Sequence, residues 1–274
     1  KFLKDKLPSN LLNYNKKVIN VDRSEKKIKI NFEDNSLIEC DYLIVCDGVF
    51  STTKSLIANK DIKPKYFNSI ALRAKVKKDH FKDLEHNNIS LFLGSNLHSV
   101  IYPIDKSNKL NFISILKKKL THLQINNYSL FEDKDFISSI LSELSKQIGS
   151  EKLKNLEDIK CFPIFVSKEI YNSKNKNIFL IGDAFFTSPP TYAQGTSQSI
   201  EVAFELYKSL QDDMEQFNIQ RIKRIKMINN KSRFNIFAFH LSNPLIIIIR
   251  NLLMKYLVKN KKFINSYLGK IYKN

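Results

Sequence analysis

Residues 181–196 read IGDAFFTSPPTYAQGT and end a fully apolar run that is expected to form a buried strand. Asp183 then lies at a strand end, where its carboxylate can accept hydrogen bonds from a ribose. Pro190 stiffens the loop, and Gly195 lets the backbone approach a planar ligand. A helix that opens near Gln194 would offer unpaired N–H groups and a positive dipole end to an anionic group. The segment therefore predicts a ligand site and not merely a loop before a helix.

A second motif, CDGVFSTTK at residues 46–54, follows the apolar run at residues 42–46. A strand that ends in Asp47-Gly48, with Ser51 able to cap the next helix, gathers backbone N–H groups and a carboxylate at one point. Open α/β sheets bind nucleotides at this end of their strands. Because Asp-Gly is also a common turn pair, an ordinary strand-to-helix turn explains this motif equally well when it is taken alone.

Hydrophobic periodicity predicts the remaining elements. Short strands are expected at residues 17–21, 27–32 and 36–40, and a strand buried in a parallel sheet at residues 42–46, with Cys46 in the core. An antiparallel sheet is expected from residues 69–76, 89–92, 99–103 and 110–116. Two helices follow from apolar positions at helical spacing, Phe136, Ile137, Ile140, Leu141 and Leu144 in one and Ile200, Ala203, Phe204, Tyr207 and Leu210 in the other. Residues from Met214 onward predict further helices.

The composition, with 43% hydrophobic and 26% charged residues, is that of a folded globular chain. Six glycines leave no G-x-G-x-x-G, and the chain starts at Lys1, so we expect a fragment. Three widely spaced cysteines fit a reduced cytoplasmic environment better than a disulfide scaffold. No metal site is predicted, because no histidine has metal-ligand spacing with a cysteine or another histidine; solvated or core histidines are expected at His80, His86, His98, His122 and His240.

The formal net charge of +18 raises nucleic acid or an anionic membrane as partners. No Asp or Glu follows Glu215, so much of the charge excess belongs to the C-terminal part. A polar, basic stripe, formed by Asn251, Lys255, Lys259 and Lys262, lies on an otherwise apolar predicted helix. This pattern suits a membrane-surface helix that makes peripheral contact, or a helix that packs on the rest of the protein, and we favour packing. The apolar run near Leu245 ends at Arg250, too soon for a membrane span.

Together the two motifs resemble the second and third FAD signatures of the class A flavoprotein monooxygenases, the family of p-hydroxybenzoate, salicylate and ubiquinone-biosynthesis hydroxylases. The matching residues are Asp47, Gly48, Ser51 and Lys54 in one signature and Gly182, Asp183, Ala184, Pro190, Gln194 and Gly195 in the other. Tyr102-Pro103 in the predicted sheet resembles the family's substrate domain. The salicylate-hydroxylase branch is similar at Arg221, Arg224, Ser232, His240, Pro244 and Arg250. The chain departs from the family where Phe186 replaces His, Lys54 replaces Arg, Ala193 replaces Gly and Ser197 replaces Asn.

The resemblance implies an α/β fold: a partial, Rossmann-like FAD-binding domain at residues 1–64 and 166–212, an inserted, mostly antiparallel substrate-binding sheet at 65–165, and C-terminal helices at 213–274. Asp183 would bind the FAD ribose or the adjoining phosphate, Asp47 and Gly48 would lie near the pyrophosphate, and the isoalloxazine would be lined by Pro190, Gln194, Gly195 and Thr196. Since the family's G-x-G-x-x-G would lie upstream, we expect the chain alone to bind FAD poorly.

The implied reaction uses NAD(P)H to reduce FAD and O2 to form a flavin hydroperoxide, which hydroxylates a small aromatic or quinone-precursor ring. Neither a catalytic residue nor a nucleic-acid partner is predicted. Two alternatives stay open: a related FAD oxidoreductase of the prenyl-lipid reductase type, and a non-catalytic basic protein that binds a surface. Phenol-stimulated NADH oxidation would support the monooxygenase, and salt-dependent nucleic-acid binding without flavin would support the non-catalytic protein.

Overall fold

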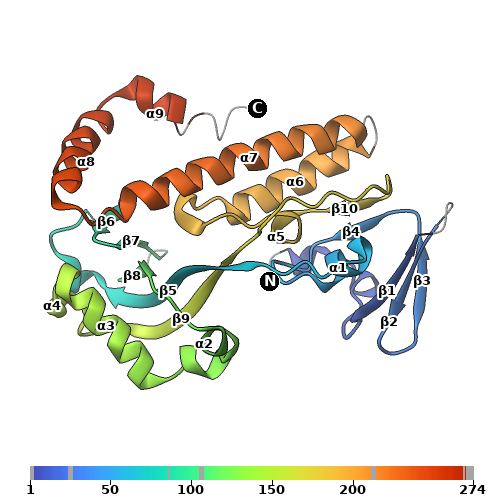
Figure 1. The fold of residues 1–274 in the computed structure, drawn as a ribbon, viewed down its shortest axis with the longest axis horizontal. Coiled ribbons are helices and arrows are strands. Elements are labelled where there is room, and N and C mark those ends of the chain that lie inside the picture. Colours follow the sequence, from blue (N-terminus) through green and yellow to red (C-terminus); the bar gives the residue numbers. More distant parts are fainter. Residues whose placement is uncertain are drawn as a thin grey trace. The chain divides into compact units, whose positions relative to one another are not determined.

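The computed structural model describes residues 3–23, 27–85, 87–104, 108–210, 214–267 and 269, which form a mixed α/β fold (Figure 1). The chain divides into two compact units. Unit 1 comprises Lys1–Lys65, Ser167–Ser188 and Ala193–Ile225, and unit 2 comprises Tyr66–Val166, Pro189–Tyr192 and Lys226–Asn274. The predicted fold class, α/β with a mostly antiparallel sheet and C-terminal helices, is confirmed.

Unit 1 begins with two short 3-10 turns, Lys4–Lys6 and Ser9–Leu11, and a three-stranded antiparallel sheet. The sheet has the order β1–β2–β3, with bounds Val18–Arg23, Ile28–Phe32 and Leu37–Cys40. The three strands predicted from alternation are confirmed. They pack because Val21, Ile28 and Ile30 join one apolar core with Val45 and Ile57.

A parallel pair of strands carries the two motifs: β4 (Leu43–Val45) pairs with β10 (Ile178–Leu180). All of β10 is buried, as predicted. The predicted burial of residues 42–46 is wrong, because Ile44 is 43% exposed and Cys46 is exposed. In the described part of the chain β4 pairs with one strand only, so its apolar side chains lack the cover that a central strand receives.

Helix α6 (Gly195–Ser209) lies beside the long helix α7 (Met214–Phe239), as Figure 1 shows. The predicted helix is confirmed. Three of the apolar residues whose spacing predicted it do not face the core, because Ile200, Phe204 and Tyr207 are 59% to 63% exposed. Val202 and Leu206 are the buried positions, and they pack with Phe179, Ile181 and Phe217. Burial of a charged cluster between α6 and α7, described below, rotates the helix in this way.

Unit 2 is built on a sheet of five strands in the described residues, in the order β6–β7–β8–β5–β9. Their bounds are Lys65–Lys77 for β5, Ser90–Gly94 for β6, Leu97–Pro103 for β7, Lys109–Lys117 for β8 and Glu157–Val166 for β9. The four predicted stretches are confirmed. Strand β9, which contains Pro163, was not predicted; at the end of the sheet a proline costs no hydrogen bond on the open side.

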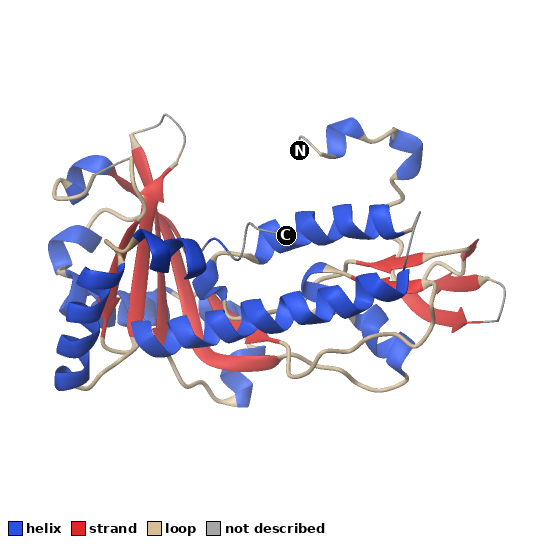
Figure 2. Cartoon of the chain, turned by 90° about the horizontal axis from the view of Figure 1, so that it is seen from above, coloured by secondary structure: helices blue, strands red, loops and turns tan. Residues whose placement is uncertain are grey.

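Helices cover one face of this sheet (Figure 2). The predicted helix is α3 (Lys134–Ile148), which begins where Asp133 accepts a hydrogen bond from the backbone N–H of Phe136 at 2.8 Å. Its Ile140 and Leu144 pack against β5, β7 and β8 residues such as Leu72. Shorter pieces connect the strands: the 3-10 turns Lys78–Phe81 and Tyr128–Phe131, α2 (His122–Asn126) and α4 (Ser150–Leu153).

The end of α7 contributes Ile236 to the other face of the sheet, where it packs with Ile115, Ile164 and Val166. Helices α8 (Pro244–Leu257) and α9 (Lys261–Tyr267) follow, which confirms the predicted helical C-terminal part. Arg250 is buried and donates from Nη1 to the backbone oxygens of Ala238 and Phe239 at 3.2 and 3.4 Å, so it caps the end of α7. None of the helices in the described residues has the length and apolar character needed to cross a membrane.

Candidate cofactor site

The two motifs lie at the same edge of the parallel strand pair. Val45 pairs with Leu180, and the N–H of Ile181 donates to the carbonyl of Val45 at 3.0 Å. Asp47 and Gly182 each follow this pair by two residues, so the carboxyl ends of both strands present a glycine and an aspartate together. This edge is where open α/β sheets bind nucleotides.

The Asp47-Gly48 turn leads directly into α1 (Thr52–Ala58). Ser51 accepts a hydrogen bond from the N–H of Lys54 at 3.0 Å, which confirms its predicted capping role. Asp47 also accepts from the N–H of Thr53 at 3.2 Å. Gly48 has a φ of +84°, a conformation that L side chains disfavour. Part of the hydrogen-bonding capacity of Asp47 is therefore used to shape this turn.

Lys54, at the position where the family has an arginine, points into unit 1 and is 3% exposed. Burial lowers the pKa of its amine, and the Asp47 carboxylate opposes that shift. Lys54 is thus an internal counter-charge for Asp47 and does not reach outward as a phosphate-binding side chain.

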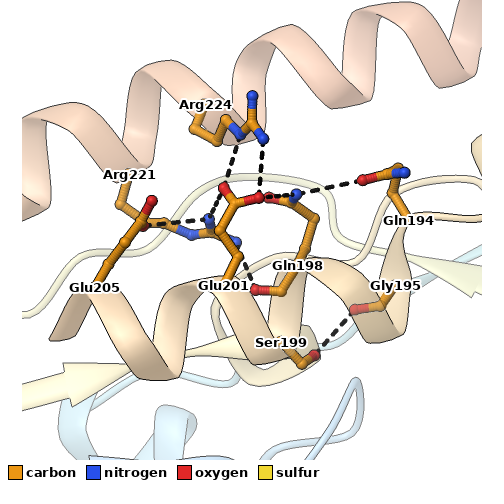
Figure 3. Close-up of polar contacts among 8 residues, drawn as sticks. All are labelled: Gln194, Gly195, Gln198, Ser199, Glu201, Glu205, Arg221 and Arg224. Carbon is orange, nitrogen blue, oxygen red and sulfur yellow. Dashed lines mark hydrogen bonds and ion pairs between the residues drawn. The ribbon is translucent and has the colours of Figure 1, made fainter. Parts of the chain in front are cut away.

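A close approach of two helices explains why residue 182 is a glycine. Gly182 starts α5 (Gly182–Phe185) with a φ of +56°, and a Cβ there would lie 3.1 Å from the Ser199 Oγ. Ser199 donates in turn to the carbonyl of Gly195 at 3.0 Å (Figure 3). Gly182 therefore brings the end of β10 next to the first turn of α6.

Asp183 is accessible at the surface, although protein atoms pack against its carboxyl. This partial burial raises the carboxyl pKa, while a hydrogen bond with Thr187 opposes the shift. Ala184 beside it is fully buried, and Phe186, where the family has a histidine, is also buried in the core of unit 1. Of these residues, Asp183 is the one with a polar group open to a ligand.

Helix α6 begins at Gly195, as predicted, with Gln194 as its N-cap residue. Within the described chain no side chain caps this end, and the exposed first turn includes Gly195 and Thr196. The first N–H groups of the helix are therefore available to an anionic group, which the positive end of the helix dipole also favours.

A buried chain of hydrogen bonds holds the Gln194 side chain (Figure 3). Gln198 donates from Nε2 to the Gln194 Oε1 at 3.3 Å and to the Glu201 Oε2 at 2.8 Å. Gln194 and Gln198 are 8% and 5% exposed. The orientation of Gln194, the N-cap residue of α6, is thereby linked to Glu201, two turns along the helix.

Glu201 is the centre of an ion-pair cluster between α6 and α7 (Figure 3). Arg224 donates to both carboxylate oxygens of Glu201 at 2.8 Å. Arg221, 3% exposed, donates to the carbonyl of Gln198 at 3.2 Å and lies 3.5 Å from Glu201 and 3.8 Å from Glu205. Burial opposes ionisation of Glu201, but its bonds with Arg224 and Gln198 prevail and lower its pKa.

This cluster was not predicted, although the sequence carries a signal for it. Gln194, Gln198, Glu201 and Glu205 recur at spacings of four, three and four residues, which places them on one helix face. Of the residues similar to the salicylate-hydroxylase branch, Arg221, Ser232, His240 and Arg250 are buried, so they support the fold.

Pro190 lies in unit 2, in the turn Pro190–Tyr192, and is exposed. The turn is tied to the C-terminal helices, because Thr191 donates to the carbonyl of Ser232 at 2.7 Å and Tyr192 to that of Tyr267 at 2.9 Å. Unit 1 thus gathers Gly182, Asp183, Ala184, Gln194, Gly195 and Thr196, with Asp47 and Gly48 on the adjacent strand end.

Ala193, just before α6, has a φ of +51°, in the left-handed region that favours glycine. We expect Ala193→Gly to raise the unfolding free energy by about 1 kcal/mol, because the relief of strain exceeds the added entropy of the unfolded chain. Urea unfolding measures this change. Ala203→Gly, at an exposed position within α6, is the matched control and is expected to lower stability by about 1 kcal/mol. A loss of stability in both variants would contradict this assignment of strain.

Similarity to known proteins agrees with this geometry. A family model described as "FAD binding domain" matches residues 15–216. The chain is 26% identical to an FAD-dependent monooxygenase of Aspergillus terreus over 222 residues, which are 74% of this chain and 49% of that protein. It is 21% identical to 6-hydroxynicotinate 3-monooxygenase of Bordetella bronchiseptica, covering 87% of this chain and 64% of that protein. The chain thus spans about half to two thirds of the length of these relatives.

Two solved structures share the fold. HpxO of Klebsiella pneumoniae, complexed with FAD and uric acid, has a TM-score of 0.78 at 17% identity and covers 99% of this chain and 70% of that one. A salicylate hydroxylase substrate complex has a TM-score of 0.72 at 16% identity and covers 95% and 71%. Since the family model matches most of the chain, the chain belongs to the FAD-binding-domain family.

Proposed function

We propose that the protein is an FAD-dependent monooxygenase that uses NAD(P)H and O2 to hydroxylate a small aromatic or quinone-precursor ring. The observation that carries the proposal is the shared edge of β4 and β10, where Asp47-Gly48 and Gly182-Asp183 lie together beside the uncapped start of α6. The named activities of the relatives, which include a 6-hydroxynicotinate 3-monooxygenase and a salicylate hydroxylase, support it.

The residues at this edge fit FAD. Asp183 offers a hydrogen-bond acceptor for the ribose or the adjoining phosphate region, while Asp47 and Gly48 would flank the pyrophosphate. The first turn of α6, with Gln194, Gly195 and Thr196, would receive an anionic part of the isoalloxazine, and we assign Pro190 to the same ring. Bound FAD would pass two electrons from NAD(P)H to O2, so that one oxygen atom enters a ring C–H as a hydroxyl and the other leaves as water.

We assign substrate binding to the sheet of unit 2, within residues 65–165, and FAD binding to residues 1–64 and 166–212. On one face of the sheet Arg73 donates from Nε to the Asn111 Oδ1 at 3.0 Å. The buried Asn111 Nδ2 has no hydrogen-bond partner among the described residues. A buried donor beside a guanidinium suits an oxygen substituent on a small ring.

The three cysteines, none of them disulfide-bonded in the structure, support a cytoplasmic location.

Asp183→Ala is expected to raise the FAD dissociation constant about 30-fold, because a charge-assisted hydrogen bond is worth about 2 kcal/mol. FAD titration of the protein expressed from its complete coding sequence measures this. Asp61→Ala removes an exposed unit 1 carboxylate paired with Lys63 and serves as control. Unchanged FAD affinity in the Asp183 variant would reject the site.

Turnover tests the reaction itself. NADH or NADPH oxidation that a phenol stimulates, with matching O2 consumption and a hydroxylated product, is the expected result. A protein that binds FAD tightly and shows no O2-dependent turnover would instead be a reductase of related fold. The FAD titration thus tests the assignment of the cofactor site, and the turnover assay separately tests the proposed reaction.

A further inference from the structure

Helix α8 turns its apolar side outward. Seven large apolar side chains on it are between 46% and 72% exposed: Leu245, Ile246, Ile248, Ile249, Leu252, Leu253 and Tyr256. At 100° per residue they span an arc of about 160°, and the buried Arg250 lies outside that arc, toward the end of α7. The apolar residues that we expected to pack are therefore open to solvent. A continuous apolar surface of this kind marks an interaction site.

The charged residues of α8 and of the segment that follows it are all basic. Lys255, Lys259, Lys261 and Lys262 are exposed at the end of α8 and the start of α9. No acidic residue follows Glu215 in the sequence. A second copy docked through the same surface would bring these lysines toward each other, and the segment that carries them has no carboxylate to neutralise them. An anionic lipid surface supplies the complementary charge together with an apolar layer.

The length of α8 decides how it would meet a bilayer. Its 14 residues extend about 21 Å, whereas a hydrocarbon core is about 30 Å thick. Asn243 caps its start by accepting hydrogen bonds from the N–H groups of Leu245 and Ile246, so the helix is stable at its exposed end. A helix of this length with one apolar side lies in the plane of the interface.

We propose that α8 docks the protein on anionic membranes, with the Leu245–Tyr256 side chains of the apolar arc among the acyl chains and the four lysines at the lipid phosphates. This inference is independent of the proposed flavin chemistry. A protein docked in this way could reach an apolar molecule that is dissolved in the membrane.

Vesicle flotation tests the proposal with the protein expressed from its complete coding sequence. Phosphatidylserine-containing vesicles are expected to carry the protein, with binding that weakens as salt is added, and phosphatidylcholine vesicles are expected to carry much less. Ile249→Ser/Leu252→Ser should reduce the partition coefficient at least about tenfold, and Lys259→Glu/Lys262→Glu should do the same. These side chains are exposed or near the surface, so thermal unfolding should match the unchanged protein.

Leu123→Ser is the matched control, because Leu123 is 83% exposed on α2, away from α8 in the sequence. It should leave vesicle binding unchanged. Absence of binding to anionic vesicles, or equal binding by all variants, would overturn the proposal. So would a lipid-free dimer that the Ile249→Ser/Leu252→Ser variant dissociates, since the arc would then be the contact between two copies.

Discussion

Replacing Glu201 by alanine is expected to lower the unfolding free energy by about 3 kcal/mol, because two arginines would lose their principal counter-charge. Arg221 is 3% exposed and cannot recover full hydration by moving outward. Glu205 lies 3.8 Å from it and would compensate only in part. Urea unfolding of the variant and the unchanged chain measures the difference.

An exposed ion pair provides the control. Lys29 and Glu39 are 3.2 Å apart with side chains 43% exposed, so Glu39→Ala should change stability by no more than about 0.5 kcal/mol. The cycle of Glu201→Ala, Arg224→Ala and the double variant should give a coupling of about 1–3 kcal/mol. Additive effects of the two substitutions would show that the Glu201–Arg224 ion pair of Figure 3 contributes little to the free energy of unfolding.

The same substitution tests the link to the cofactor site. Without Glu201, the Gln198 amide keeps Gln194 as its side-chain partner but loses the 2.8 Å bond that orients it. We therefore expect weaker FAD binding in addition to lower stability. Glu201→Gln keeps the size of the side chain and one acceptor oxygen, so its effect on FAD should be smaller.

Local sequence was sufficient for elements whose burial is decided within a few residues. The run Ile178–Leu180 is apolar at every position, and β10 is buried throughout. Ser51 precedes a helix and caps it through a bond within three residues, as predicted. Such features depend on short-range geometry, which residue type and spacing encode directly.

Sequence was insufficient where distant partners choose the buried face. Helix α6 has two candidate faces, an apolar one with Phe204 and a mixed one with Glu201 and Leu206. The mixed face is buried because Arg221 and Arg224, about twenty residues later, meet Glu201 there. Strand β4 differs in the opposite direction. Its apolar residues predict burial, but in the described chain it pairs with β10 alone, and Ile44 stays 43% exposed.

Sequence motifs predicted the residues of the cofactor site, but they did not predict the side chains that hold those residues in place. The fold brings Gly182 and Asp183 close to Gly195, because Ser199 lies against Gly182 and donates to the carbonyl of Gly195. The contacts of these residues with FAD stay predictions. The support of Gln194 by Gln198 and Glu201 is tertiary and was not foreseen. Motifs identify groups that meet a ligand, whereas the groups that hold them in place depend on packing.

The paired histidines of unit 2 are expected to make stability fall steeply between pH 6.5 and pH 5. The Nδ1 of His98, on β7, lies 2.7 Å from the Nε2 of His240, at the end of α7, and both residues are buried. Burial lowers the pKa of His98 to about 3, aided by His240, and that of His240 to about 4, aided by the Lys117 charge. Phe239, the other ring packed on His98, carries no charge.

Because the pKa values of both histidines are lowered in the folded chain, acid is expected to reduce the free energy of unfolding. Below pH 6.5 the unfolded chain binds protons on both histidines, while the folded chain keeps them neutral until about pH 4. Each histidine should therefore cost up to about 1.4 kcal/mol of stability per pH unit in this window. Carboxylates with lowered pKa, such as Glu201, lose stability only at lower pH, because their unfolded values lie near pH 4.5.

Urea unfolding at several pH values between 7 and 5 measures the slope. The His98→Gln/His240→Gln variant should be less stable at pH 7 and should lose less stability toward pH 5, because glutamine does not titrate. His122→Gln, at an exposed position on α2, should keep the slope of the unchanged chain. Equal slopes in the double variant and the unchanged chain would mean that the His98–His240 contact does not hold the histidines neutral, and that acid unfolding of unit 2 begins elsewhere.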